Sequence, residues 1–171
     1  MLQDFVQEII NTVRSELSGV HTAMPGKIVS FDAKKCLATV IPMIKYVMPD
    51  GERVDYPQIT GVPVLIPQTN GGDSVVAYPI KKGDSCLIIV SERSVDYWMY
   101  GQDTDTDLSH DLTNAICIPG LLRGANEALK DACSNNAVII KNGSSKITIK
   151  KNEIDIDAET IKVNGQTLQN S

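Results

Sequence analysis

Aromatic side chains are scarce in this chain: Phe, Trp and Tyr make up 5% of its 171 residues, and Trp98 is the single tryptophan. Proteins that bind single-stranded nucleic acid stack bases on aromatic rings and neutralise phosphates with Lys and Arg. Here 16 Lys and Arg face 21 Asp and Glu, so the formal net charge is −5. We therefore expect no nucleic-acid binding.

The chain also lacks long apolar runs and closely spaced metal ligands. No run approaches the roughly 18 apolar residues that a membrane-spanning helix needs, and residues 1–5 show no basic region ahead of an apolar one, so we expect no signal peptide. The cysteines Cys36, Cys86, Cys117 and Cys133 lie far apart, and the chain has only 2 histidines. We expect no zinc site and interpret all four cysteines as reduced core residues of a chain made in a cytoplasm.

Residues 2–18 have the spacing of an amphipathic helix. Apolar side chains recur every three or four positions from Leu2 to Leu17, and polar ones fill the other side. Asp4 suits the first turn, and Gly19 can end the helix. Two interpretations stay open: the helix packs on its own domain, or it docks on a partner subunit.

Residues 25–119 predict short strands separated by turns such as Asn70-Gly71-Gly72 and Lys82-Gly83-Asp84. Pro42, Pro63 and Pro67 belong at strand edges or bulges, because proline lacks the ladder donor. Five or six such strands favour a small barrel of the OB type. The expected strands are Gly26–Phe31, Cys36–Ile41, Gly61–Ile66, Ser74–Tyr78, Asp84–Val90 and Ala115–Ile118. Residues 121–134 predict a short helix that acts as a linker.

The C-terminal zone contains four β-branched triplets, and the last three recur every seven residues. Residues two apart share a face on a strand but lie about 200° apart on a helix, so the triplets predict strands and not a coiled coil. The predicted core positions are Val138, Ile140, Ile147, Ile149, Ile154, Ile156, Ile161 and Val163.

These strands have one apolar face and little else in the chain to cover it. Arrays this small are not stable alone, so we expect several copies to share the core, and three-fold symmetry is the simplest closed form. Four strands about 4.8 Å apart would give a shaft of roughly 20 Å. The alternative is a flat two-stranded hairpin packed on the barrel.

An ordered series of short motifs resembles the central spike proteins of contractile phage baseplates, tailocins and related injection systems. It is strongest at His110-Asp-Leu-Thr-Asn-Ala-Ile116, followed by Pro119 and Gly120. The other segments are Gly26–Asp32, Ala38–Val40, Asp50-Gly51, Val62–Val64, Pro79–Asp84 with Gly83 and Asp84, and Ser91–Arg93.

The resemblance implies an OB-fold domain followed by a trimeric β-helix that caps the tail tube and pierces the cell envelope on sheath contraction. It implies a homotrimer bound to hub or tail-tube proteins, located in a virion or tailocin particle after assembly in the host cytoplasm. His110, Asp111, Gly83, Asp84, Pro119 and Gly120 would be structural. Family members often end in a His-x-His apex that binds iron; residues 164–171 lack histidine, so we expect no metal or cofactor. Leu168 and amide side chains, or a separate tip protein, would close the tip.

Two short patterns suggest chemistry that we do not expect. Ser109-His110-Asp111 contains the three residue types of a catalytic triad. Neighbours on a strand point to opposite faces, however, so these three side chains cannot assemble a triad. Asp103–Asp107 resembles the start of a calcium loop whose glycine and final glutamate are missing. We therefore expect no enzyme activity.

The sequence thus predicts a mainly β protein in four parts. They are residues 1–24, an N-terminal helix and lead; 25–120, an OB-type domain; 121–136, a linker; and 137–171, a trimeric β-helical spike and tip. Two alternatives stay open: an OB-fold module that binds oligosaccharide or oligonucleotide, and a tail-associated polysaccharide-degrading enzyme.

Overall fold

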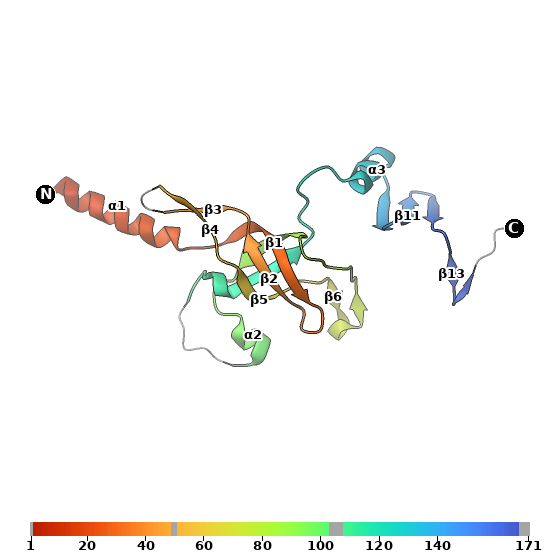
Figure 1. Ribbon diagram of the computed structural model, residues 1–171, viewed down its shortest axis with the longest axis horizontal. Coiled ribbons are helices and arrows are strands. Elements are labelled where there is room, and N and C mark those ends of the chain that lie inside the picture. The colour runs from red at the N-terminus through yellow and green to blue at the C-terminus, as the bar shows by residue number, and fades with distance from the viewer. Residues whose placement is uncertain (1, 49–50, 103–107, 168–171) are drawn as a thin grey trace. The chain divides into compact units, whose positions relative to one another are not determined.

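A computed structural model describes residues 2–48, 51–102 and 108–167. The chain divides into two compact units, residues 1–121 and 122–171 (Figure 1). Each unit is described by itself below. The finer division into four parts stays a prediction.

The first unit begins with helix α1, Leu2–Ser18, which has the bounds that the apolar spacing predicts. Asp4 lies in its first turn, where the positive end of the helix dipole favours a carboxylate. All of residues 2–18 are exposed to solvent. The interpretation that this helix packs on its own domain is therefore wrong.

The core of the first unit is a five-stranded antiparallel sheet in the order β5-β2-β1-β8-β9. The sheet curls, because Leu65 N in the segment after β5 donates to Cys117 O of β9 at 2.9 Å (Figure 1). The prediction of a mainly β, barrel-like domain is confirmed. Its strands are β1 (Ala23–Asp32), β2 (Leu37–Pro42), β5 (Ile59–Pro63), β8 (Ser85–Val90) and β9 (Ala115–Pro119).

Burial alternates along these strands with a period of two, as expected for a sheet with one covered face. In β2 and β8 every second residue is buried, and Val40 and Ile88 have no exposed surface. Pro63 ends the edge strand β5, in agreement with its expected edge position, whereas Pro42 ends the inner strand β2. The core consists of Met24, Ile28, Ala38, Val40, Ile59, Val62, Val64, Cys86, Ile88, Ala115 and Cys117.

Gly26 lies where β1 passes over the side chain of Ile88. A Cβ at this position would overlap Ile88 Cδ1 and lie 2.8 Å from Ile88 Cγ1 and 3.2 Å from Cys86 Sγ. We expect Gly26→Ala to lower the free energy of unfolding by about 1–3 kcal/mol, because overpacking forces side chains from their preferred rotamers. Thermal unfolding measures this change. Gly124→Ala is the control, since no atom lies within 4 Å of a Cβ there, and an equal effect of both changes would contradict the packing argument.

Several short elements of the first unit were not predicted. A hairpin of β3 (Lys45–Val47) and β4 (Arg53–Asp55) carries an ion pair between Lys45 Nζ and Asp55 Oδ1 at 2.5 Å. The expected strand at residues 74–78 is shorter than predicted, because only its first two residues pair. The remaining elements are β6 (Gln68–Thr69), η1 (Asn70–Gly72), β7 (Ser74–Val75), α2 (Asp96–Tyr100) and η2 (Leu112–Asn114).

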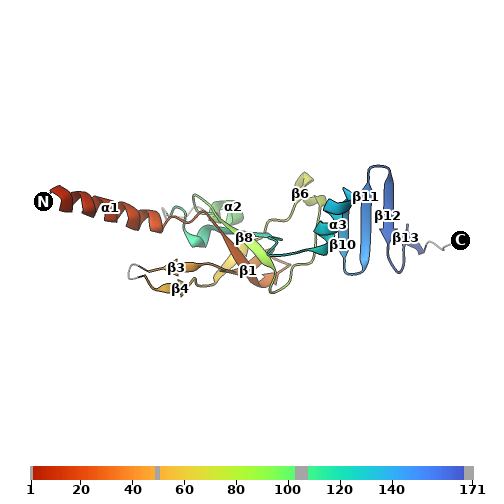
Figure 2. The same ribbon diagram turned by 90° about the horizontal axis from the view of Figure 1, so that it is seen from above.

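The second unit begins with helix α3, Glu127–Asn135, which starts later than the predicted residue 121. Asn126 fixes this start, since its side chain accepts a hydrogen bond from Leu129 N at 3.0 Å. Three antiparallel strands follow, β10 (Val138–Asn142), β11 (Ser145–Lys150) and β12 (Glu153–Asp157), and lie side by side in Figure 2. The unit ends in a hairpin of β13 (Lys162–Val163) and β14 (Gln166–Thr167).

Candidate assembly surface

Strands β10, β11 and β12 align their β-branched side chains in register on one face of the sheet. In an antiparallel pair, residues directly opposite each other project to the same side. The pairings run across all three strands, so that two apolar rows form. This surface, called the Ile/Val face below, consists of Val138, Ile140, Ile147, Ile149, Ile154 and Ile156.

The Ile/Val face is open to solvent. Ile154 is 67% exposed, Val138 61% and Ile140 60%, and Ile147 is half-buried. Burying apolar surface contributes about 25 cal/mol per Å², and a contiguous exposed apolar patch marks an interaction site. The face therefore has the character of an interface.

The chain itself covers the opposite face of the same sheet in part, near β10. Helix α3 packs against β10, and its Ala128 and Ala132 are half-buried. On that face Thr148 is 7% exposed and Ile139 is half-buried. The two faces thus differ: α3 packs on part of one, and among the described residues the other is covered only near Ile161.

Charged side chains of the sheet lie away from the Ile/Val face. Lys146 is paired with Asp157 across β11 and β12, and Lys150 Nζ lies 3.2 Å from Glu153 Oε1. Within β10–β12 the Ile/Val face carries no charged side chain. Packing this face against a second apolar surface would therefore bury no charge of these strands.

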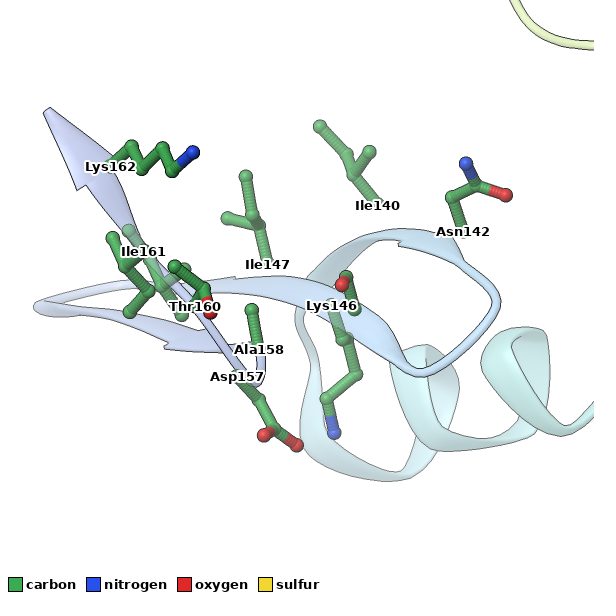
Figure 3. Close-up of a pocket in the computed structure, with 11 residues that line it drawn as sticks. Ile140, Asn142, Lys146, Ile147, Asp157, Ala158, Thr160, Ile161 and Lys162 are labelled. Carbon is green, nitrogen blue, oxygen red and sulfur yellow. The ribbon is translucent and has the colours of Figure 1, made fainter. Parts of the chain in front are cut away.

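A hollow of about 370 Å³ adjoins the Ile/Val face and brings Ile161 to it. Its lining includes Ile140, Ile147 and Ile156 from the face together with Ile161. Figure 3 shows Ile140 and Ile147 projecting to one side of the sheet and Asp157 to the other. Four of the predicted core side chains thus line one concave surface.

The prediction that four strands form one ladder is wrong for the fourth strand, at residues 161–163. Val163 pairs with Gln166 in a separate two-stranded hairpin, and Ile161 lies just before it. Asn164 (φ 50°) and Gly165 (φ 79°) both have positive φ, which suits the tight two-residue turn of a hairpin. The turn gives the fourth triplet its own partner strand, so it does not join β12. The predicted burial of all eight residues in a shaft stays a prediction.

The motif residues Gly83, Asp84, Pro119 and Gly120 lie around β8 in the first unit. Gly83 (φ 99°) donates its N–H to Ile28 O at 2.8 Å, and the Asp84 carboxylate accepts from Lys81 N at 2.7 Å. Gly120 (φ 96°) donates to Ser85 O at 3.1 Å. These bonds close turns at the ends of the sheet, and both glycines adopt a left-handed conformation that side chains disfavour.

His110 and Asp111 lie in a turn before η2. His110 (φ 52°) donates its N–H to Glu92 O at 3.3 Å, and its O accepts from His21 N at 3.1 Å. The side chain of His21 is half-buried and meets the Tyr56 ring edge-on, with centroids 5.9 Å apart. The backbone hydrogen bond to His110 and the ring contact with Tyr56 thus hold His21 against the domain.

The Asp111 carboxylate caps η2 and accepts from Thr113 N at 2.8 Å and Thr113 Oγ1 at 2.6 Å. These hydrogen bonds hold the pKa of Asp111 below its usual value. We expect Asp111→Ala to lower the free energy of unfolding by about 0.5–2 kcal/mol, and Asp111→Asn, which keeps an acceptor, to lower it less. Chemical denaturation at neutral pH measures both.

The same pKa shift predicts a pH dependence. Since the folded pKa lies below the unfolded one, the carboxylate contributes its full stabilisation above the unfolded value of about 3.9 and loses it as the pH falls through the folded value. The difference in the free energy of unfolding between the wild type and Asp111→Asn should become smaller in that acidic range. A gap that stays constant from neutral to acidic pH would contradict the assignment.

The four cysteines lie in two different environments. Cys86 and Cys117 are buried in the core, but Cys36 and Cys133 are exposed, so the assignment of all four to the core is wrong. Cys36 lies at a strand turn (φ 55°) and Cys133 on the polar side of α3. Among the described residues no cluster of three His, Cys, Asp or Glu could hold a metal ion.

Two further sequence patterns fall where no geometry is described. The calcium-like pattern at 103–107 and the predicted tip at Leu168 lie outside the described residues. In the part of the chain that the structure covers, no helix is long and apolar enough to cross a membrane.

Comparison with known proteins places the first unit in a family. A family model described as the phage protein Gp138 N-terminal domain matches residues 24–120, more than half of the 171 residues and nearly the whole curled sheet. No curated protein matches the chain. The match supports a phage structural protein. The chain belongs to the family of phage proteins that share the Gp138 N-terminal domain.

Proposed function

We propose that three copies of the chain pack their Ile/Val faces around a common axis and form the short shaft of a tail-tip spike. The observation that carries this proposal is the exposed Ile/Val face, whose six apolar side chains line up across three strands without any charge among them. Three flat faces around one axis form a closed prism in which every face points inward. The faces covered by α3 would then lie outside.

The family match and the predicted strand pattern support a position at the tip of a phage tail. A baseplate spike caps the tail tube and is driven into the target cell envelope when the sheath contracts. The work required of it is mechanical, and we propose no catalytic site or resident cofactor. The spike would bind hub or tail-tube proteins, and a separate tip protein could cap it.

Stiffness is the property that such a shaft needs, and the proposed prism supplies it. Strands hydrogen-bonded within each sheet and packed against two other sheets cannot bend without breaking many contacts at once. Each strand adds about 4.8 Å to a sheet, so the three strands that carry the Ile/Val face give a short shaft of about 14 Å. This length fits a compact tip better than a long needle.

Sedimentation equilibrium of the full chain tests the assembly. The expected mass is three times the 18.6 kDa of one chain. A mass of one chain at micromolar concentration would contradict the proposal, and a mass of two would contradict the three-fold arrangement. Antibody labelling of intact particles, viewed by electron microscopy, then tests the position at the tail tip.

A further inference from the structure

Helix α1 carries the largest continuous set of exposed apolar side chains in the first unit, with exposed fractions from 38% to 78%. At 100° per residue these side chains cover an arc of about 140°, wider than the seam of a two-stranded coiled coil. The set is called the α1 apolar face below. It consists of Leu2, Phe5, Val6, Ile9, Ile10, Val13 and Leu17.

A helix of this kind requires a partner surface. Isolated helices near 15 residues are marginal in water, and most helical stability in proteins comes from packing an apolar face. Helix α1 has 17 residues, several of them β-branched, which lowers its intrinsic propensity. None of these 17 residues is buried. Within the described part of its own unit α1 therefore has no covering surface, and another copy of the chain can supply one.

The end of α1 is fixed to the curled sheet almost immediately after the helix stops. His21 N donates to His110 O at 3.1 Å, and Val90 N donates to Thr22 O at 2.7 Å. Only Gly19 and Val20 separate Ser18 from these anchored residues. In a trimer, the C-terminal ends of the three helices would therefore be fixed at three equivalent points, and the helices would share one direction. Their effective concentration would lie in the millimolar range.

The margins of the α1 apolar face carry opposite charges. On the helical wheel Glu16 lies about 20° inside the margin formed by Phe5, and Arg14 lies about 40° beyond the other margin, which Ile10 forms. Around a three-fold axis, one margin of each helix faces the other margin of its neighbour. Glu16 and Arg14 differ by two positions, about 3 Å along the axis, so an acidic margin meets a basic one at each contact.

We propose that the three α1 helices of one assembled particle pack through their apolar faces as a parallel three-helix bundle. This inference rests on the proposed trimer and adds a second assembly surface at the N-terminal end. The bundle buries the α1 apolar face of every copy and leaves Asp4 and Glu8 in water. A partner that presents its own apolar groove to α1 is the competing occupant.

Disulfide trapping in the full chain tests the bundle. Cys36→Ser and Cys133→Ser remove the exposed thiols, and Val13→Cys then places one thiol at the centre of the α1 apolar face. Ser15→Cys in the same background is the matched control, because Ser15 lies on the opposite side of the helix. Under mild oxidation we expect covalent dimers from the first variant at least ten times faster than from the control, and Ile9→Cys should repeat the result if the first variant assembles poorly.

Sedimentation of the same samples before oxidation separates this inference from the proposed function. A trimer in which Val13→Cys reacts no faster than Ser15→Cys would overturn the bundle and leave the spike proposal standing; the competing partner would then cover the helix. A monomer in all variants and in the wild type would overturn both. A trimer with selective trapping supports the bundle.

Discussion

Replacing Ile154 with Asn is expected to convert the trimer into single chains. Ile154 lies on the Ile/Val face, pairs with Ile149 and is 67% exposed in one chain, so the change should leave the isolated chain folded. In the proposed prism the same position is buried three times around the axis. A buried polar group without a partner costs about 1–3 kcal/mol, and three such groups meet at one level.

Sedimentation equilibrium and thermal unfolding of Ile154→Asn measure this effect. Asp155→Asn is the matched control, because Asp155 is the next residue, pairs with Thr148 and projects to the opposite side of the sheet. The control should remain a trimer. An unchanged trimer with unchanged melting for Ile154→Asn would refute the buried shaft.

Replacing Ile88 with Ala is expected to destabilise the curled sheet strongly without acting on the assembly surface. Ile88 has no exposed surface, belongs to the core cluster and lies in β8 between two paired strands. Truncating a buried Ile to Ala typically costs about 2–5 kcal/mol, since it removes apolar contacts and leaves a cavity. The melting temperature of the first unit should fall by several degrees or more.

Leu65→Ala is the control for Ile88→Ala, because Leu65 is 47% exposed. Exposed substitutions usually change stability by less than about 0.5 kcal/mol. Below the melting temperature, Ile88→Ala should sediment as the wild type does. If both changes lowered the free energy of unfolding equally, the core would lie elsewhere. If Ile88→Ala lost the trimer below its melting temperature, trimer assembly would depend on the stability of the first unit, which we do not expect.

Local patterns predicted the elements whose side-chain periodicity is strong. The three- and four-residue spacing of α1 gave its bounds, and the β-rich runs Cys36–Ile41 and Asp84–Val90 lie where β2 and β8 form. Short pairs such as β3 with β4 were missed, because three residues are too few to establish a period. Helix α3 was placed too early, since the capping role of Asn126 outweighs the apolar spacing before it.

The candidate surface could be foreseen only in part. That the isoleucines of β11 and β12 share a face follows from their spacing alone, because the period of a strand is two. That Val163 leaves this array depends on the Asn164-Gly165 turn, which pairs it with Gln166. The Asn164-Gly165 dipeptide, which favours positive φ at both turn residues, is a signal in the sequence that the strand pattern obscured.

The amino-acid sequence by itself determined which side chains share a face, because the geometry of helices and strands converts spacing directly into direction. It determined in this way the α1 apolar face and the Ile/Val face. Only the tertiary structure decided which of those faces the chain covers for itself. Whether a face is buried depends on contacts between segments far apart in sequence, such as Leu65 on Cys117 or His21 on His110. Local spacing holds no information on such contacts. The sequence left open whether α1 packs on its own domain, and only the fold shows that its apolar side chains are exposed.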